Sequence, residues 1–347
     1  MFISEAGYFC RFLNNRNMKN FKKICAMSVF VVLAVMSGAQ GIYAQAPNDR
    51  HKVSDRRSVS TTVSGQTGTI VSENASGANV DIDGVIYALH NKNGKPADAF
   101  ISQAVKAKVS GKDIVIPDYI TYKGGKYPVR DMRGGIFRDM HIKSVKLPST
   151  LREIANAAFR GTPITEITIP ASVKRVQGSA FYGCSKLTNV VFESDRMDEL
   201  HGCFQHCTAL KSIKLPRMVG LMSYEMFWGC TNLTEVTLPE NMSEIYESMF
   251  KDCRSLKTVG IPSSVVKMDN YAFAGSGITE IDISSVTEFG ADCFSGCKAL
   301  KTVKLNAALK DDFLMETYDI FVGCPLLEVK YMNDRYVYPA GFVFVEK

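Results

Sequence analysis

Apolar residues recur along this chain in rows of 22 or 23 residues, beginning at Ile142. The row ITEITIPASVKRVQGSAFYGCSK opens with Ile164, Ile167 and Ile169, and polar residues stand between them. Because side chains alternate between the two faces of a strand, this spacing predicts a short strand with its apolar face turned inward. Eight such rows follow one another, and the eighth is longer. Self-similarity at this period predicts a repeat solenoid.

The rest of each row follows a common order. Proline stands after the strand in five rows, where its missing N–H ends ladder pairing. An apolar pair such as Leu151 and Ile154 turns the chain back, a phenylalanine closes all eight rows, and cysteine stands three residues later in six of them. The closing residues are Phe159, Phe181, Phe204, Phe227, Phe250, Phe273, Phe294 and Phe321. The cysteines are Cys184, Cys207, Cys230, Cys253, Cys297 and Cys324.

The third row contains HGCFQHC, a cluster of the side chains that zinc and copper prefer. Phe204 and Cys207 occupy the regular stations of the row, and Cys203 stands where other rows have Ala or Met. The seventh row repeats the cysteine spacing as CFSGC without a histidine. We therefore expect buried free thiols in the interior, with no metal and no cofactor. The weaker alternative is a metal site formed by His201, Cys203, His206 and Cys207.

The amino-terminal residues 1–46 have the pattern of a signal peptide. Basic residues precede the 13-residue apolar run 24–36, which is well short of the ~20 residues that span a bilayer. Small residues at Ala44 and Ala46 suggest cleavage after Ala46, and Met18 is an alternative start. The sequence thus predicts export to the cell surface, the periplasm or the medium, without a membrane span after cleavage. The basic residues of the leader are Lys19, Lys22 and Lys23.

Composition divides the remaining chain into further segments. Residues 47–79 contain no aromatic residue and many Ser, Thr, Gly and Asn, which predicts a flexible polar linker. Residues 80–141 have short apolar runs, with Gly124 and Gly125 marking a hairpin, which predicts a β-rich cap. The eight repeats then occupy residues 142–326, and residues 327–347 are expected to form a C-terminal strand and cap.

Charge and motifs narrow the function. Removing residues 1–46 takes away five of the 41 basic residues and one of the 35 acidic residues, so the net charge falls from +6 to +2. This balance does not favour nucleic acid, which selects concentrated positive patches. The chain has no HExxH, no GxxxxGK[ST], no GxGxxG after a strand and no GxSxG, so we expect that it is not an enzyme.

The rows resemble the BspA-like leucine-rich repeat family, whose unit runs roughly LxxIxIPxSVxxIGxxAFxxC. The resemblance covers residues 81–340 and is close in ITEITIPASVKRVQGSAFYGC. The third row lacks the proline and moves its apolar pair to Met197 and Leu200, and the eighth has an insertion around residues 310–318. The resemblance implies a parallel β-sheet on the concave face with short helical or irregular turns on the convex side. It also implies a bacterial exported protein, of a kind that includes adhesins.

Candidate binding residues follow from the stacking of the rows. Equivalent outward positions form two columns of mostly short, polar residues on the strands, and the residue after each closing Phe lies at a turn near one edge. Tyr182 and Trp228 occupy that edge two rows apart and are candidate anchors. The candidate binding residues on the strands are Lys146, Glu166, Lys214, Glu235, Glu280, Asp282 and Lys304.

Three functions are consistent with these features. The first is an exported binding protein for a protein or glycan partner, which includes another cell surface or host matrix. The second is a structural envelope component without a discrete ligand. The third, favoured least, is metal binding at the third row. The sequence leaves the partner, the binding face and the oligomeric state open.

Overall fold

The computed structural model describes residues 62–63, 66–74, 76–306, 320–327, 330–332, 335–337 and 341–345. These residues belong to one compact unit, Asp55–Lys347. The predicted leader 1–46 and the predicted insertion around residues 310–318 lie outside the described residues. No helix among the described residues is long and apolar enough to cross a membrane.

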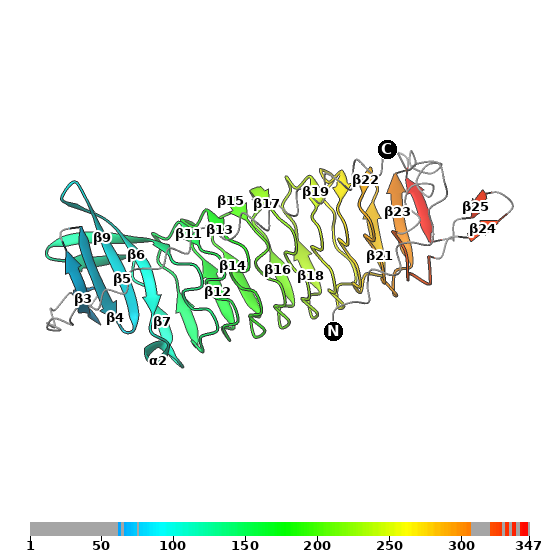
Figure 1. Cartoon of the computed structure of the whole chain (residues 1–347). Coiled ribbons are helices and arrows are strands. Elements are labelled where there is room, and N and C mark those ends of the chain that lie inside the picture. Colours follow the sequence, from blue (N-terminus) through cyan, green and yellow to red (C-terminus); the bar gives the residue numbers. More distant parts are fainter. Residues whose placement is uncertain are drawn as a thin grey trace, which may run out of the picture. The chain divides into compact units, whose positions relative to one another are not determined.

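A six-stranded sheet precedes the repeats (Figure 1). Its strand order is β3-β4-β5-β6-β9-β8, and all neighbours are antiparallel except β6 and β9. Alternate residues of β5 are buried, which matches the two-residue period of its apolar side chains. The strands are β3 (Thr69–Asn74), β4 (Gly77–Ile82), β5 (Val85–Lys92), β6 (Lys95–Ala104), β8 (Tyr119–Tyr122) and β9 (Gly125–Met132). The predicted hairpin is confirmed, because Tyr122 pairs with Gly125 at its end.

Strands also occupy part of the segment expected to be a linker. Residues 62–63 and 66–67 form the short hairpin β1 (Thr62–Val63) and β2 (Gln66–Thr67), and β3 and the first half of β4 lie before residue 80. Most of β3 is exposed, so burial of apolar side chains does not explain it. Its backbone instead pairs with β4, which is itself held by β5. A composition-based prediction misses such a strand because the stabilising hydrogen bonds come from the neighbouring strand.

The opening segments of the rows form short parallel ladders that lie side by side (Figure 1). These strands are β7 (Asp113–Val115), β10 (Ser144–Lys146), β12 (Glu166–Ile169), β14 (Asn189–Phe192), β16 (Ser212–Lys214), β18 (Glu235–Thr237), β21 (Glu280–Ile283), β23 (Thr302–Asn306) and β26 (Phe342–Val345). We call their outward side the strand face. This parallel stacking confirms the predicted leucine-rich-repeat coil.

A second set of short parallel strands follows the turn-back of each coil (Figure 1). The set comprises β11 (Glu153–Ile154), β13 (Arg175–Val176), β15 (Arg196–Leu200), β17 (Met218–Met222), β19 (Glu244–Ile245), β20 (Lys267–Met268) and β22 (Glu288–Phe289). Met197 and Leu200 are buried on β15, which confirms the shifted apolar pair of the third row. Turns connect these strands, and the single helix in the described part of the chain is α2 (Lys106–Val109), four residues long.

The closing phenylalanines form one stacked column through the interior. Ring centroids of successive coils lie between 5.0 and 6.1 Å apart, with interplanar angles of 20° or less. Offset stacking of this kind adds attraction between the rings to the burial of their surface. The column begins one coil earlier than the predicted rows, at Phe137. The earlier coil is completed by β7, which pairs with β10.

The cysteines form a second interior column with its own hydrogen bonds. All eight described cysteines are buried and have free thiols, as the row pattern predicts. Six of them each place the sulfur 3.0 to 3.2 Å from the carbonyl oxygen of the closing Phe one coil earlier. The thiol is small enough for the interior and still donates an S–H to a buried carbonyl. Thr162 and Ser276 stand at this station in the two rows without cysteine.

Candidate functional site

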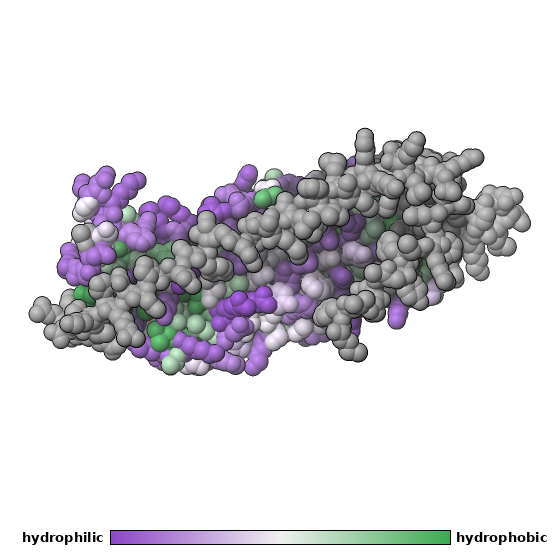
Figure 2. Space-filling view, in the orientation of Figure 1, coloured by the Kyte–Doolittle hydropathy of each residue, from purple (hydrophilic) through white to green (hydrophobic). Residues whose placement is uncertain are grey.

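The strand face carries the seven strand residues that the sequence singled out, and all seven side chains are exposed. The registers place equivalent residues of neighbouring coils next to each other, so the two predicted columns exist where the strands pair. Figure 2 shows mainly hydrophilic residues over the described surface, with a small hydrophobic area near β7. On β7 itself, Val115 is 55% exposed.

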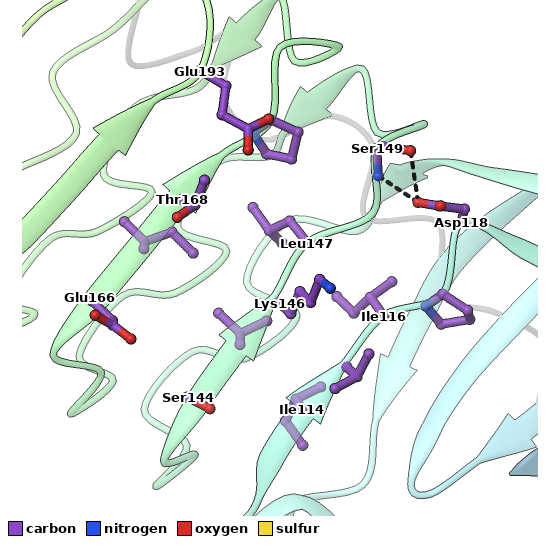
Figure 3. Close-up of a pocket in the computed structure, with 15 residues that line it drawn as sticks. Ile114, Ile116, Asp118, Ser144, Lys146, Leu147, Ser149, Glu166, Thr168 and Glu193 are labelled. Carbon is purple, nitrogen blue, oxygen red and sulfur yellow. Dashed lines mark hydrogen bonds between the residues drawn. The ribbon is translucent and has the colours of Figure 1, made fainter. Parts of the chain in front are cut away.

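A groove of about 710 Å³ lies on the strand face across β7, β10 and β12 (Figure 3). Its floor consists of apolar residues such as Ile114 and Ile167, and the polar side chains of Lys146, Glu166 and Thr168 line it. Lys146 and Glu166, both predicted site residues, thus come together here. Neither forms an ion pair with a described residue, so both charges are free for a partner.

One rim of this groove is held by hydrogen bonds. Ser149 donates its backbone N–H and its hydroxyl to Asp118 Oδ1, at 2.6 and 3.0 Å (Figure 3). The hydroxyl of Thr150 donates to the backbone oxygens of Asp118 and Val129. These bonds connect the first coil to the hairpin of β8 and β9. The groove is therefore preformed, which lowers the entropy cost of binding.

A second groove, of about 470 Å³, lies on the strand face near β21 and β23. It contains the predicted residues Glu280, Asp282 and Lys304, and Lys304 Nζ lies 3.7 Å from Asp282 Oδ2. Desolvation opposes ionisation of Asp282, but hydrogen bonds from Ser284 and the charge of Lys304 outweigh it and lower its pKa. Gly260 also lines this groove, on a coil without a strand, and a Cβ added there would meet no atom within 4 Å.

The two remaining strand predictions, Lys214 on β16 and Glu235 on β18, lie outside both grooves. Lys214 pairs in register with Thr237, and Glu235 pairs with Ser212. The structure therefore groups the strand predictions into two clusters with a flatter polar stretch between them.

Tyr182 and Trp228 lie at the turns that follow the closing Phe, which we call the turn edge. They are connected there by His206, which the sequence suggested as a metal ligand. The ring of His206 lies between them, with centroids 5.2 Å from Tyr182 and 4.9 Å from Trp228. The turn prediction is right for the residues after the closing Phe, but Gln205 and Ala274 are buried there. Arg160 and Lys251 lie at this edge because each directly follows a closing Phe, whereas His206 and Tyr271 were not predicted there.

The potential metal ligands of the third row do not come together. His201 Nε2 lies 3.3 Å from Glu199 Oε2, and His206 packs between aromatic rings. The sulfurs of Cys203 and Cys207 face Met226 and the backbone oxygen of Phe181 in the interior. Burial raises the pKa of both thiols well above the ordinary value, which disfavours the thiolate that a metal needs. Within the described residues, no group of three or more His, Cys, Asp and Glu could hold a metal.

Stacked coils with a Leu or Ile strand and a closing Phe define a leucine-rich repeat solenoid. The chain belongs to the BspA type leucine-rich repeat family, whose profile matches six copies in residues 130–231 and 221–335. No curated protein matches the chain.

Several solved structures are similar to this chain. A leucine-rich cell surface protein from Faecalibacterium prausnitzii is 28% identical, with a TM-score of 0.45, and the match covers 62% of this chain and 52% of that one. This chain thus spans about half the length of that protein. The pneumococcal vaccine antigen PcpA is 16% identical, with a TM-score of 0.40 and coverage of 67% and 82%. A leucine-rich repeat protein from Bacteroides ovatus is 19% identical, with a TM-score of 0.25 and coverage of 70% and 98%.

Proposed function

We propose that this protein is an exported, non-catalytic binding protein whose strand face contacts a protein on another cell or in the host matrix. The observation that carries the proposal is the strand face itself, an open polar surface with unpaired charges and two preformed grooves. Proteins of this repeat class usually mediate protein interactions. The leader pattern of residues 1–46 supports export.

The strand face is better suited to many small contacts with a partner protein than to a few strongly binding side chains. Its outward residues are short and of mixed sign, and the candidate positions include no Trp, Tyr or Arg. Hot spots are enriched in those three residue types, so affinity here comes from many small contacts and from charge complementarity. We therefore expect micromolar rather than nanomolar binding by each molecule, strengthened when many copies act together on a cell surface.

Binding to purified matrix proteins tests this proposal. The full chain is passed over immobilised fibronectin, laminin and collagen, and the variant Lys146→Glu with Lys304→Glu is compared with Lys186→Glu with Lys301→Glu. The first pair lies in the two grooves, and the second pair is exposed outside them. The groove variant should lose binding to at least one of these proteins, and the control should retain it. Equal binding by both variants would contradict a role for the strand face.

Two other functions give different results in the same experiment. A structural envelope component would bind none of the matrix proteins and would instead co-purify with envelope fractions independently of Lys146 and Lys304. A metal-binding protein would contain stoichiometric zinc or copper by elemental analysis, and His201→Ala would remove it. The separate surroundings of the four His and Cys side chains argue against this last function.

A further inference from the structure

Cations and aromatic rings alternate along the turn edge over six successive coils. In chain order the residues are Arg160, Tyr182, His206, Trp228, Lys251 and Tyr271, which we call the edge band. Each member contacts the next. The guanidinium carbon of Arg160 lies 4.3 Å from the Tyr182 ring centroid, and Lys251 Nζ lies 5.7 Å from that of Trp228 and 5.0 Å from that of Tyr271. The imidazole ring of His206 contacts Tyr182 on one side and Trp228 on the other, which completes the series.

The turn after each closing Phe explains how these residues line up. The second residue after the Phe has a positive φ and is usually glycine, as at Gly183 (+68°) and Gly229 (+73°). His206 takes this station at +56°, and a Cβ on Gly229 would lie only 2.4 Å from its Nδ1. The missing side chain of Gly229 therefore makes the space that His206 needs between the rings. Tyr271 belongs to the same kind of turn, since its backbone oxygen accepts from the Ala274 N–H.

The cations of the edge band have no acidic partner. Neither Arg160 nor Lys251 forms an ion pair or a side-chain hydrogen bond with any described residue. Two acidic residues of these turns pair with other cations, Asp139 with Arg138 and Asp252 with Arg254, each at 3.4 Å. The edge band thus contains two cations, Arg160 and Lys251, that form no ion pair with a described residue.

The aromatic rings hold these cations in place. Cation–π contacts restrict the side chains of Arg160 and Lys251, so less rotamer entropy is lost when an anion binds. The outward N–H groups of a stacked guanidinium match a carboxylate or sulfate. The phenol of Tyr182 and the indole N–H of Trp228 make no hydrogen bond with a described residue. Both groups can bond hydroxyl groups of a ligand.

The spacing of the charges selects the kind of anion. Cations recur at every second coil, which is about 10 Å if each coil advances by one strand spacing. An acidic peptide places charges about 3.5 Å apart, and a nucleic acid strand places them about 3.4 Å apart along the duplex axis. One charge per two coils instead corresponds to one anionic group per disaccharide, with the intervening sugar packed on a ring by dispersion.

We propose that the edge band binds an acidic polysaccharide that carries one anionic group per disaccharide. The chain of sugars runs along the coil axis, with its carboxylates or sulfates on Arg160, His206 and Lys251. Its hydroxyl-bearing sugars lie against Tyr182, Trp228 and Tyr271. This site is separate from the strand face and does not depend on the function proposed for it.

Hyaluronan is the probe for the test, because it has one carboxylate per disaccharide. Binding of the full chain to hyaluronan oligosaccharides is measured by calorimetry, with dextran, poly-glutamate and single-stranded DNA for comparison. Affinity should rise with length up to about three disaccharides, the span of six coils, and neutral dextran should not bind. Poly-glutamate and DNA should bind at least about tenfold more weakly.

Matched variants separate this site from the strand face. Arg160→Gln with Lys251→Gln should weaken hyaluronan binding about tenfold or more, because two charge-assisted contacts are lost. Trp228→Leu should weaken it less, and circular dichroism checks that each variant is folded. Lys146→Gln with Lys214→Gln removes the same charge from the strand face and should leave hyaluronan binding unchanged. Equal losses in both double variants, or equally tight binding of poly-glutamate, DNA or dextran, would overturn the proposal.

Discussion

The interior columns and the edge band repeat with different periods, although both belong to the same coils. The phenylalanine column repeats at every coil, because each ring stacks on its own equivalent in the next coil. The cysteines follow the same period in six rows, each bonding the carbonyl oxygen of the closing Phe one coil earlier. The edge band repeats at every second coil, and unlike residues contact each other there. Packing between equivalent residues of neighbouring coils explains a period of one coil, but it does not explain the period of two coils in the edge band. A surface pattern that departs from the period of the core therefore points to a role outside the core.

Among substitutions that test this difference, the largest loss of stability is expected in the phenylalanine column. Phe204→Ala removes a fully buried ring that stacks on Phe181 and Phe227. It should lower the free energy of unfolding by about 3 to 5 kcal/mol, as large-to-small changes in cores do. Denaturant unfolding measures this loss. Trp228→Ala, on the edge band one coil later, is the comparison, and a loss as large as that of Phe204→Ala would contradict the division between the two regions.

The next effect concerns the cysteine column and depends on pH. Burial raises the pKa of Cys184 to about 11 and that of Cys230 to about 12. The folded state therefore holds these protons more tightly than the unfolded state, so the stabilisation is complete below about pH 8.5 and is lost as the pH rises. For Cys230 the loss should reach about 2 kcal/mol at pH 10.

The variant Cys230→Ala isolates this thiol from the other groups that titrate at alkaline pH. Its unfolding free energy should fall less than that of the parent between pH 8 and pH 10, when both are measured in urea under reducing conditions. Parallel curves for the two proteins would show that the thiol of Cys230 does not titrate differently in the two states.

A smaller effect distinguishes two equivalent glycines on the turn edge. Gly183 and Gly229 both have a positive φ, but a Cβ would meet no atom within 4 Å at Gly183 and would clash with His206 at Gly229. Gly183→Ala should cost about 1 kcal/mol, the strain of a left-handed residue. Gly229→Ala should cost about 1 kcal/mol more from the displaced imidazole. Adding His206→Ala should remove that excess in thermal unfolding, and an unchanged excess would show that His206 does not cause it.

The smallest effect is expected for an ion pair on the second set of strands. Arg175 Nε lies 2.7 Å from Glu153 Oε2, and both side chains are partly exposed. Such pairs contribute about 0.2 to 1 kcal/mol. A double-mutant cycle with Arg175→Gln and Glu153→Gln measures the coupling. A coupling near that of the interior columns would show that surface pairs, and not only stacked apolar residues, hold the coils together.

Much of the interior was predictable because the apolar positions within each row show which of its side chains face the core. The apolar residues that open a row, its closing Phe and its Cys are buried, apart from Phe192 and Ile261, which are partly buried. The third row follows the same rule with Met197 and Leu200 in place of the regular pair. The earlier coil at Phe137 was not predicted, since the hairpin of β8 and β9 interrupts the row between its strand and its Phe. A period read from the sequence cannot bridge an insertion of that kind.

The candidate sites were predictable to different degrees. The two columns of the strand face follow from register alone, and Asp282 with Lys304 could be paired by counting residues, whereas Lys146 and Glu166 stand in different columns and share only a groove. The edge band was predictable only in part: four members stand directly after a closing Phe, but His206 stands two residues after one and Tyr271 two residues before one. Their common position depends on the left-handed turn residues and on the space left by Gly229.

The amino-acid sequence by itself determined the coil, its interior columns and the outward columns of its strands, because these depend on side-chain period and on contacts between equivalent residues. It also determined that Cys203 and Cys207 are interior residues. Only the tertiary structure decided that His206 lies between Tyr182 and Trp228, and that Arg160 and Lys251 have no acidic partner among the described residues. The reason is that turns bring together residues at unequal positions in their rows, through backbone conformations and clearances that no single row contains.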